Sequence, residues 1–105
     1  MFNLMHDLYS VMDEEIDGAE TYAEKAISCK ETMPDLAKTF HQMSLDEMKH
    51  ASTIEAEIKR VIAAEKTKNP QEVTGTMDMI YSFMHDQFAM KVVKIQMMQT
   101  KFKEM

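Results

Sequence analysis

Glycine and proline are scarce in this chain of 105 residues, which contains only two of each. Small β-sandwiches and barrels need many tight turns, and those turns usually depend on these two residues. The long stretches between them are rich in Ala, Glu, Lys, Met and Gln, which favour helix formation. The sequence therefore predicts an all-α protein made of a few long helices.

The two prolines divide the chain into three predicted helices. Pro34 and Asp35 have the pattern of a helix start, with proline in the first turn and an acid near the positive end of the helix dipole. The run at residues 69–72 (Asn-Pro-Gln-Glu) repeats this pattern, and Gly75 follows closely enough to delay the third helix until about Thr76. We predict one domain, residues 1–105, with helices over about residues 3–30, 34–67 and 76–103.

The charge balance is acidic, with 12 basic and 18 acidic residues and a formal net charge of −6. No segment is basic enough to form a phosphate-binding surface, so the sequence argues against nucleic acid as a partner. The acidic surface suits the attraction of cations, although such a surface also keeps many small proteins in solution.

Cysteine usage and the N-terminal segment predict a cytoplasmic location. Cys29 is the single cysteine, which rules out an internal disulfide and favours a reducing compartment. The N-terminus lacks the basic and apolar regions of a signal peptide, and no apolar run is long enough to span a bilayer. We therefore expect no membrane partner.

The first two predicted helices should form an antiparallel hairpin, because the connection around residues 31–33 is short. Both carry a stripe with the alternating steps of three and four residues that mark a packed helix face. In the first helix the expected inward positions are Leu4, Leu8, Val11, Glu15, Gly18, Tyr22, Ala26 and Cys29. In the second helix they are Leu36, Phe40, Met43, Glu47, His50, Ile54, Ile58 and Val61. Titratable groups interrupt both apolar stripes near the middle.

Three of these titratable residues are expected to meet. Glu47 and His50 are three residues apart, so both can point at one place from adjacent turns of one helix face. Counted from a turn centred near residue 32, Glu15 is 17 residues away, Glu47 is 15 and His50 is 18. At about 1.5 Å per residue, the height of Glu15 in the hairpin falls between those of Glu47 and His50 and lies within roughly 3 Å of each. The three side chains should converge at one level within an apolar seam.

Buried carboxylates and a buried imidazole need compensation, because an unpaired charge in the interior is costly. One interpretation is a hydrogen-bonded network in which the carboxylates are partly protonated or paired with Lys25 or Lys49, although neither lysine falls on a stripe. The other is a metal site, since carboxylate and imidazole ligands suit iron, manganese or zinc. The coincidence of stripe and height with a third, acidic ligand, Glu15, favours the metal site.

Two short motifs resemble those of the ferritin-like di-iron superfamily. Glu15 and Tyr22 match the Glu-x6-Tyr of its first helix, and Glu47 with His50 matches the Glu-x-x-His of its second helix. A full-length member has two such hairpins in one chain, whereas this sequence has one, over about residues 5–65. The chain therefore resembles a half-ferritin, similar to the encapsulated ferritins and to rubrerythrin-type helices. The resemblance implies a ferritin-like four-helix bundle that is completed by dimerisation around two iron ions.

The resemblance also implies a role for each matching residue. Glu47 would bridge the two metal ions, while Glu15 and His50 would each be a terminal or semi-bridging ligand. Tyr22 would lie beside the metal pair in the catalytic site, or would simply be a core aromatic residue. Glu14 would either bind incoming ions or be a solvated acid.

A ferroxidase is the function that the resemblance implies, oxidising Fe²⁺ with dioxygen or peroxide for iron storage or detoxification. A chain of this size encloses no mineral cavity, so a cage would be formed by a large homo-oligomer or by an external protein shell. Two alternatives stay open. One is a non-catalytic, metal-stabilised helical assembly, and the other is a structural oligomer whose buried polar groups fix the register of its helices.

The third predicted helix has apolar residues on two sides. One face contains Met77, Tyr81, Met84, Phe88, Val92, Ile95, Met98 and Phe102. A second, roughly opposite face contains Met79, Phe83, Met90, Val93 and Met97. A helix with two apolar faces is expected to be buried on both. We therefore predict a homodimer or a larger homo-oligomer.

Overall fold

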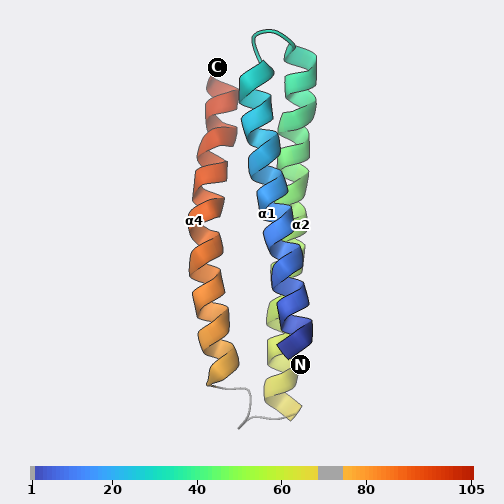
Figure 1. Cartoon of the computed structure of the whole chain (residues 1–105), viewed down its shortest axis with the longest axis vertical. Coiled ribbons are helices and arrows are strands. Elements are labelled where there is room, and N and C mark those ends of the chain that lie inside the picture. The colour runs from blue at the N-terminus through green and yellow to red at the C-terminus, as the bar shows by residue number, and fades with distance from the viewer. Residues whose placement is uncertain (1, 69–74) are drawn as a thin grey trace.

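The computed structural model describes residues 2–68 and 75–105. This part of the chain contains three long helices and no strands (Figure 1): α1 (Phe2–Cys29), α2 (Pro34–Lys68) and α4 (Thr76–Glu104). The all-α fold is confirmed, and each helix begins and ends within one residue of the range expected from the sequence. The expected helix start at residues 69–72 lies outside the described residues. None of the described helices has the apolar character that crossing a membrane requires.

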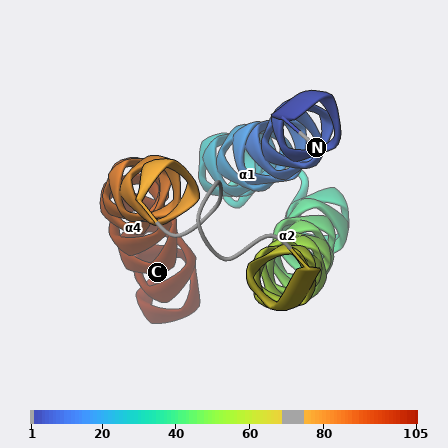
Figure 2. The same ribbon diagram turned by 90° about the horizontal axis from the view of Figure 1, so that it is seen from below.

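The helices pack side by side into a rod measuring 57 × 18 × 16 Å. α1 and α2 form the expected antiparallel hairpin, joined by a short turn at residues 30–33. α4 runs in the same direction as α1 and packs mainly on it, with less contact to α2 (Figures 1 and 2). One side of the hairpin is therefore covered by α4, and another side is open.

The start of α2 follows from two neighbouring residues. Pro34 has no backbone N–H, which suits the first turn of a helix, and Asp35 places a negative charge at the positive end of the helix dipole. The backbone N–H of Ala37 donates to the carbonyl oxygen of Met33 at 2.9 Å, which closes the first turn. The hairpin turn is thus fixed by local chemistry.

The apolar core lies between the three helices. Ile16, Ile58 and Ile95, one from each helix, are completely buried. α4 contributes one of its two apolar faces, with Met77 and Phe102 also buried at its two ends. Along α1 the buried residues are Met5, Tyr9, Met12, Ile16, Ala19, Ala23 and Ala26.

Most positions that the sequence predicts to face inward on the hairpin are not the buried ones. The buried residue is usually the next one along the helix. Leu4 is 48% exposed, whereas its neighbour Met5 is only 4% exposed. On α2, Leu36 is exposed and Ala37 is buried. The expected stripe was therefore wrong for most of its length as a description of the core of one chain, although two of its positions, Ala26 and Ile58, are completely buried. The reason is that α4 covers the adjoining side of the hairpin, so the next residue of each turn packs against it.

A buried hydrogen-bonded chain connects all three helices. Gln99 of α4 donates from Nε2 to the Ser44 hydroxyl at 2.9 Å, and that hydroxyl donates to the carbonyl oxygen of Ala19 at 2.7 Å. Both Gln99 and Ser44 are buried. A shift of α4 by one turn would leave the Gln99 amide buried without this partner, which costs about 1–3 kcal/mol. These bonds therefore fix the register of α4 on the hairpin.

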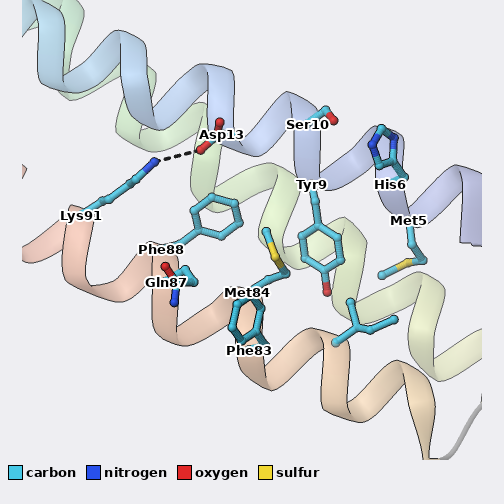
Figure 3. A pocket seen from close by; sticks show the side chains of 11 residues that line it. Met5, His6, Tyr9, Ser10, Asp13, Phe83, Met84, Gln87, Phe88 and Lys91 are labelled. Atoms are coloured by element: carbon cyan, nitrogen blue, oxygen red, sulfur yellow. Dashed lines mark hydrogen bonds and ion pairs between the residues drawn. The ribbon is translucent and has the colours of Figure 1, made fainter.

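Ion pairs add to the contact between α1 and α4. Lys91 Nζ lies 3.1 Å from Asp13 Oδ1 (Figure 3) and 3.6 Å from Asp17 Oδ1. Lys94 Nζ lies 3.4 Å from Glu20 Oε1. The hydrogen bond with Asp13 raises the pKa of Lys91 above its usual value, although burial opposes this. Exposed pairs of this kind contribute about 0–1 kcal/mol each, so the apolar core provides most of the stability.

Tyr9 extends from α1 towards α4, where its ring lies beside that of Phe88 at a centroid distance of 6.5 Å (Figure 3). Its hydroxyl is buried and has no hydrogen-bond partner among the described residues. Burial, with a smaller contribution from Tyr81, raises the pKa of Tyr9 from 10.0 to about 12. The neutral phenol is therefore strongly favoured in the folded state.

We expect the Tyr9→Phe variant to resist alkaline unfolding better than the wild type. The Tyr9 phenol ionises near pH 10 in the unfolded chain and near pH 12 in the folded protein, so its contribution is complete below pH 10 and is lost as the pH rises towards 12. The full loss corresponds to about 2–3 kcal/mol, and phenylalanine abolishes it. Thermal unfolding at neutral pH and near pH 11 measures the difference. An identical pH dependence in both proteins would contradict this prediction.

Candidate metal centre

Glu15, Glu47 and His50 lie together near the middle of the hairpin. Each offers one donor atom, and the three atoms lie within 4.8 Å of one another. His50 Nδ1 is 3.3 Å from Glu15 Oε2 and 4.0 Å from Glu47 Oε1. The structure thus brings together the three residues that the sequence predicted as metal ligands.

The helices themselves produce this convergence. Glu47 and His50 stand on adjacent turns of one face of α2, and Glu15 reaches the same level from α1 because the two helices run antiparallel from a short turn. Side chains on rigid helices hold their positions more accurately than side chains on loops. The cluster is therefore a consequence of the hairpin and does not depend on α4.

Gly18 makes space for one of the carboxylates. A Cβ atom at this position would lie 3.3 Å from Glu47 Oε2 and 3.5 Å from Glu47 Cδ. The Glu47 side chain therefore lies directly against the backbone of α1, and a larger residue at position 18 would displace it. The metal-binding motifs do not include Gly18. In the sequence it stands out only as an inward position of the first helix and as a glycine inside a helix, where it costs about 0.5–1 kcal/mol relative to alanine.

The two carboxylates lie close enough to disfavour full ionisation. A side-chain hydrogen bond with Glu15, then burial, then the negative charge of Glu15 raise the pKa of Glu47 above its usual value. The charge of His50 opposes this rise. A cation placed between the carboxylates would remove the repulsion, because it favours the ionised form of both.

The lysines that the network interpretation requires lie elsewhere. Lys25 Nζ lies over the ring of Phe40, 5.6 Å from its centroid, and Lys49 is exposed. Among the ion pairs found within residues 2–68 and 75–105, Glu15 and Glu47 pair with His50 and with no lysine. A lysine-compensated network is therefore absent from the described part of the chain.

The cluster is partly exposed to solvent. The side chain of His50 is 59% exposed, and those of Glu15 and Glu47 are 26% and 27% exposed. The sequence led us to expect these residues inside an apolar seam, and that expectation was wrong for a single chain. The exposed imidazole and the two half-buried carboxylates instead lie on a side of the hairpin that is open to solvent.

The position of Glu15 around α1 shows which face this is. Asp13 and Asp17 both pair with Lys91 of α4, and Glu15 stands midway between them in the sequence. At about 100° per residue, Glu15 points roughly 160° away from each of them around the helix axis. The candidate ligands therefore lie on the side of α1 opposite to α4, and α4 cannot cover them.

Tyr22 and Glu14 flank Glu15 along α1. Tyr22 lies two turns beyond Glu15 on α1 and is half-buried, with its ring stacked on Phe40 at a centroid distance of 6.1 Å. No hydrogen bond from Tyr22 to a candidate ligand is found in the described part of the chain. Glu14 is exposed. Tyr22 is thus a packed aromatic ring and Glu14 an exposed acid, and a role for either residue beside bound metal stays a prediction.

The donor set suits a first-row metal ion. Carboxylate oxygens and an imidazole nitrogen are accepted by iron, manganese and zinc, and no thiolate is involved. A site for two ions in a helical bundle uses about four carboxylates and two imidazoles. With two carboxylates and one imidazole, the cluster of one chain provides half of such a set.

A protein-family model, that of rubrerythrin, matches residues 8–101, a range that includes all three candidate ligands. No match was found in a search of curated proteins or in a search of solved structures. The family match extends from the first turns of α1 to near the end of α4 and so covers most of the chain. The chain belongs to the rubrerythrin family, within the ferritin-like di-iron superfamily.

Proposed function

We propose that two copies of this chain bind two iron ions between their hairpins and act as a ferroxidase, in iron storage or detoxification. The observation that carries the proposal is the convergence of Glu15, Glu47 and His50 within 4.8 Å on the open side of the hairpin. Membership of the rubrerythrin family supports iron as the metal, although the ligand types also suit manganese and zinc.

A second hairpin would complete the ligand set and cover it. Two open faces related by a two-fold axis supply four carboxylates and two imidazoles. Leu4, Val11 and Leu36 belong to the same stripe as the ligands and are exposed in a single chain, so pairing also buries apolar surface. Excluding water from the ligands lowers the local dielectric constant and strengthens the attraction between carboxylates and cations.

Fe²⁺ is the substrate of the proposed reaction. Two Fe²⁺ ions give up one electron each, and dioxygen takes both electrons with two protons to form hydrogen peroxide. With peroxide as the oxidant, two electrons and two protons give two water molecules. The iron supplies the redox chemistry, while the residues of the chain supply charge, position and exclusion of water.

Each residue of the cluster has its own task in this proposal. The missing side chain at Gly18 leaves space for the Glu47 carboxylate between the two helices, a position that suits a bridging ligand. Glu15 adds a second negative charge that offsets the charge of the cations. His50 contributes a nitrogen donor, and its exposed ring is free to turn towards an ion.

Anaerobic titration with Fe²⁺ followed by native mass spectrometry tests the proposal. We expect two iron ions for every two chains, and a rapid change in absorbance after oxygen is added. Metal binding without an oxygen-dependent change would favour the non-catalytic, metal-stabilised assembly. Absence of bound metal would contradict both functions.

We expect the Gly18→Ala variant to bind Fe²⁺ about tenfold more weakly while its helix content is unchanged. Alanine favours helix by about 0.5–1 kcal/mol over glycine, but its Cβ atom would lie 3.3 Å from Glu47 Oε2, so that carboxylate must shift by a few tenths of an ångström away from its present position. Anaerobic calorimetric titration measures the affinity, and circular dichroism measures the helix content. Gly75→Ala is the matched control, because nothing lies within 4 Å of a Cβ atom there. Equal losses of affinity in both variants would show that Gly18 does not position Glu47.

A further inference from the structure

The outer face of α4 is apolar and exposed. We name its five large side chains the outer stripe, which consists of Met79, Phe83, Met90, Val93 and Met97. Their exposed fractions range from 55% for Val93 to 76% for Met90. A groove of about 510 Å³ follows the C-terminal half of this stripe. Contiguous apolar surface of this kind is rare on a monomer and marks a contact with a partner.

The spacing of the outer stripe indicates the shape of that partner. With Asp86 included, the positions 79, 83, 86, 90, 93 and 97 follow strictly alternating steps of four and three residues. This is the period of about 3.5 residues that keeps one long helix in contact with another along its whole length. The outer stripe therefore fits a long helix lying alongside α4, and α4 itself is such a helix, with 29 residues.

We propose that the outer stripe packs against the outer stripe of a second copy of this chain, with the two α4 helices antiparallel. A two-fold axis beside residue 88 makes the stripe complementary to itself, so one surface serves both copies. The resulting pairs are Met79 with Met97, Phe83 with Val93, and Asp86 with Met90. Apolar side chains face one another towards both ends of the stripe.

Asp86 selects the antiparallel direction. In a parallel pair, equivalent positions face each other, so two Asp86 carboxylates would meet in the middle of an apolar contact. In the antiparallel pair, Asp86 lies opposite Met90 instead. Lys94 of the second copy stands one turn beyond Met90. It already pairs with Glu20 of its own chain at 3.4 Å, so it adds a longer-range attraction for Asp86 and no direct ion pair. The antiparallel arrangement therefore removes a repulsion and adds an attraction.

The same charges argue against a lipid surface as the occupant. Helices that lie on membranes carry many Lys and Arg residues beside a broad apolar face. Here an acid interrupts the apolar stripe, and the chain has a net charge of −6. Anionic lipid would repel such a protein, whereas a second α4 helix matches both its apolar side chains and its charges.

A hollow beside the outer stripe enlarges the apolar surface that a second copy can cover. It has a volume of about 620 Å³ and lies between α1 and α4. Phe83 belongs both to the outer stripe and to the lining of this hollow, and Tyr9, Met84 and Phe88 form much of the rest (Figure 3). The apolar surface is therefore continuous from the stripe into the hollow.

This contact is separate from the hairpin contact in the proposed ferroxidase. The candidate ligands lie on the side of α1 opposite to α4, so pairing through α4 leaves them uncovered. A chain with two different two-fold contacts assembles beyond the dimer, into a closed tetramer or a larger structure. The contact through α4 does not depend on metal.

Native mass spectrometry of the full chain and of a Met90→Lys variant tests the proposal. Met90 is 76% exposed, so the substitution leaves the core of one chain intact and places a charge in the outer stripe. We expect the assembly to fall to the dimer that the hairpin contact holds together, with unchanged helix content and unchanged iron bound per chain. Met33→Lys is the matched control, since Met33 is 55% exposed in the hairpin turn, and we expect it to keep the full assembly. An unchanged number of chains in Met90→Lys would overturn the proposal.

Disulfide trapping tests the direction of the two helices. In a Cys29→Ser background, chains carrying Phe83→Cys are mixed with chains carrying Val93→Cys and oxidised. Antiparallel pairing gives mixed disulfides between the two variants, because positions 83 and 93 face each other across the axis. Disulfides formed only between identical variants would overturn the antiparallel arrangement.

Vesicles of phosphatidylcholine and phosphatidylglycerol test the competing occupant. We expect the wild type not to sediment with them. Sedimentation that is lost in Met90→Lys would assign the outer stripe to a membrane surface and overturn the proposal. The ferroxidase proposal is tested separately with Glu47→Gln, which is expected to lose bound iron and to leave the contact through α4 unchanged.

Discussion

Replacing Glu47 with glutamine is expected to weaken Fe²⁺ binding by about 100-fold or more and to abolish the absorbance change that follows the addition of oxygen. The Glu47 carboxylate lies within 4.8 Å of the donor atoms of both other candidate ligands. Glutamine keeps the shape of the side chain but removes its negative charge and one of its two acceptor oxygens. If Glu47 bridges the two ions as proposed, losing its charge and one of its oxygens would weaken the binding of both ions together.

The fold should tolerate this substitution. The hydrogen bond with Glu15, burial and repulsion already raise the pKa of Glu47, so an uncharged side chain at this position relieves an unfavourable interaction. We therefore expect the thermal midpoint of the metal-free variant to equal or exceed that of the wild type. Glu24→Gln, on an exposed position of α1, is the control and should bind iron normally. Wild-type affinity in Glu47→Gln would remove this residue from the site.

Replacing Ile16 with alanine is expected to lower the free energy of unfolding by about 2–5 kcal/mol. Ile16 is completely buried, and Ile58 and Ile95 from the other two helices belong to the same apolar cluster. The loss combines the hydrophobic energy of the missing carbons with the cavity that the rigid helices cannot fill. For a domain of this size, such a loss is a large fraction of the total stability.

Guanidinium unfolding followed by circular dichroism measures this effect. Ile16→Val is the graded control, because removing one carbon typically costs about 0.5–1.5 kcal/mol. All variants should be compared at one protein concentration, since the proposed self-association would change apparent stability. Equal midpoints for Ile16→Ala and the wild type would show that this part of the core is not closely packed.

The helices and their order follow from local chemistry that a sequence displays directly. Pro34 with Asp35 specifies the start of α2, and the scarcity of glycine and proline elsewhere leaves long uninterrupted helices. The meeting of Glu15, Glu47 and His50 could be predicted for the same reason, since the rise per residue and the position of one turn are sufficient to compare heights.

The side of the hairpin that forms the core could not be predicted in the same way. On α1, apolar residues occur in neighbouring pairs such as Leu4 with Met5 and Val11 with Met12. Periodicity identifies two adjacent stripes in such a helix but not the stripe that a third helix covers. Which stripe is buried depends on where α4 docks. That position is set by long-range contacts such as Gln99 with Ser44 and Lys91 with Asp13, and no local sequence pattern contains them.

Gly18 shows a second limit of the sequence. A Cβ atom at this position of α1 would lie 3.3 Å from the Glu47 carboxylate of α2. The importance of Gly18 therefore depends on how close the two helices of the hairpin lie. A motif search looks for groups that carry chemistry, and glycine carries none. Space for a ligand becomes visible only when both backbones are placed.

The opposite orientation of Glu15 and its neighbours Asp13 and Asp17 has a consequence for evolution. Substitutions that change how α4 docks affect one side of α1, and substitutions that change metal chemistry affect the other. Mutations on the two sides should therefore have nearly additive effects, as expected for sites without shared partners. During evolution, α4 could be replaced, lengthened or packed against a different partner, which would change the quaternary structure. The candidate metal ligands would not change.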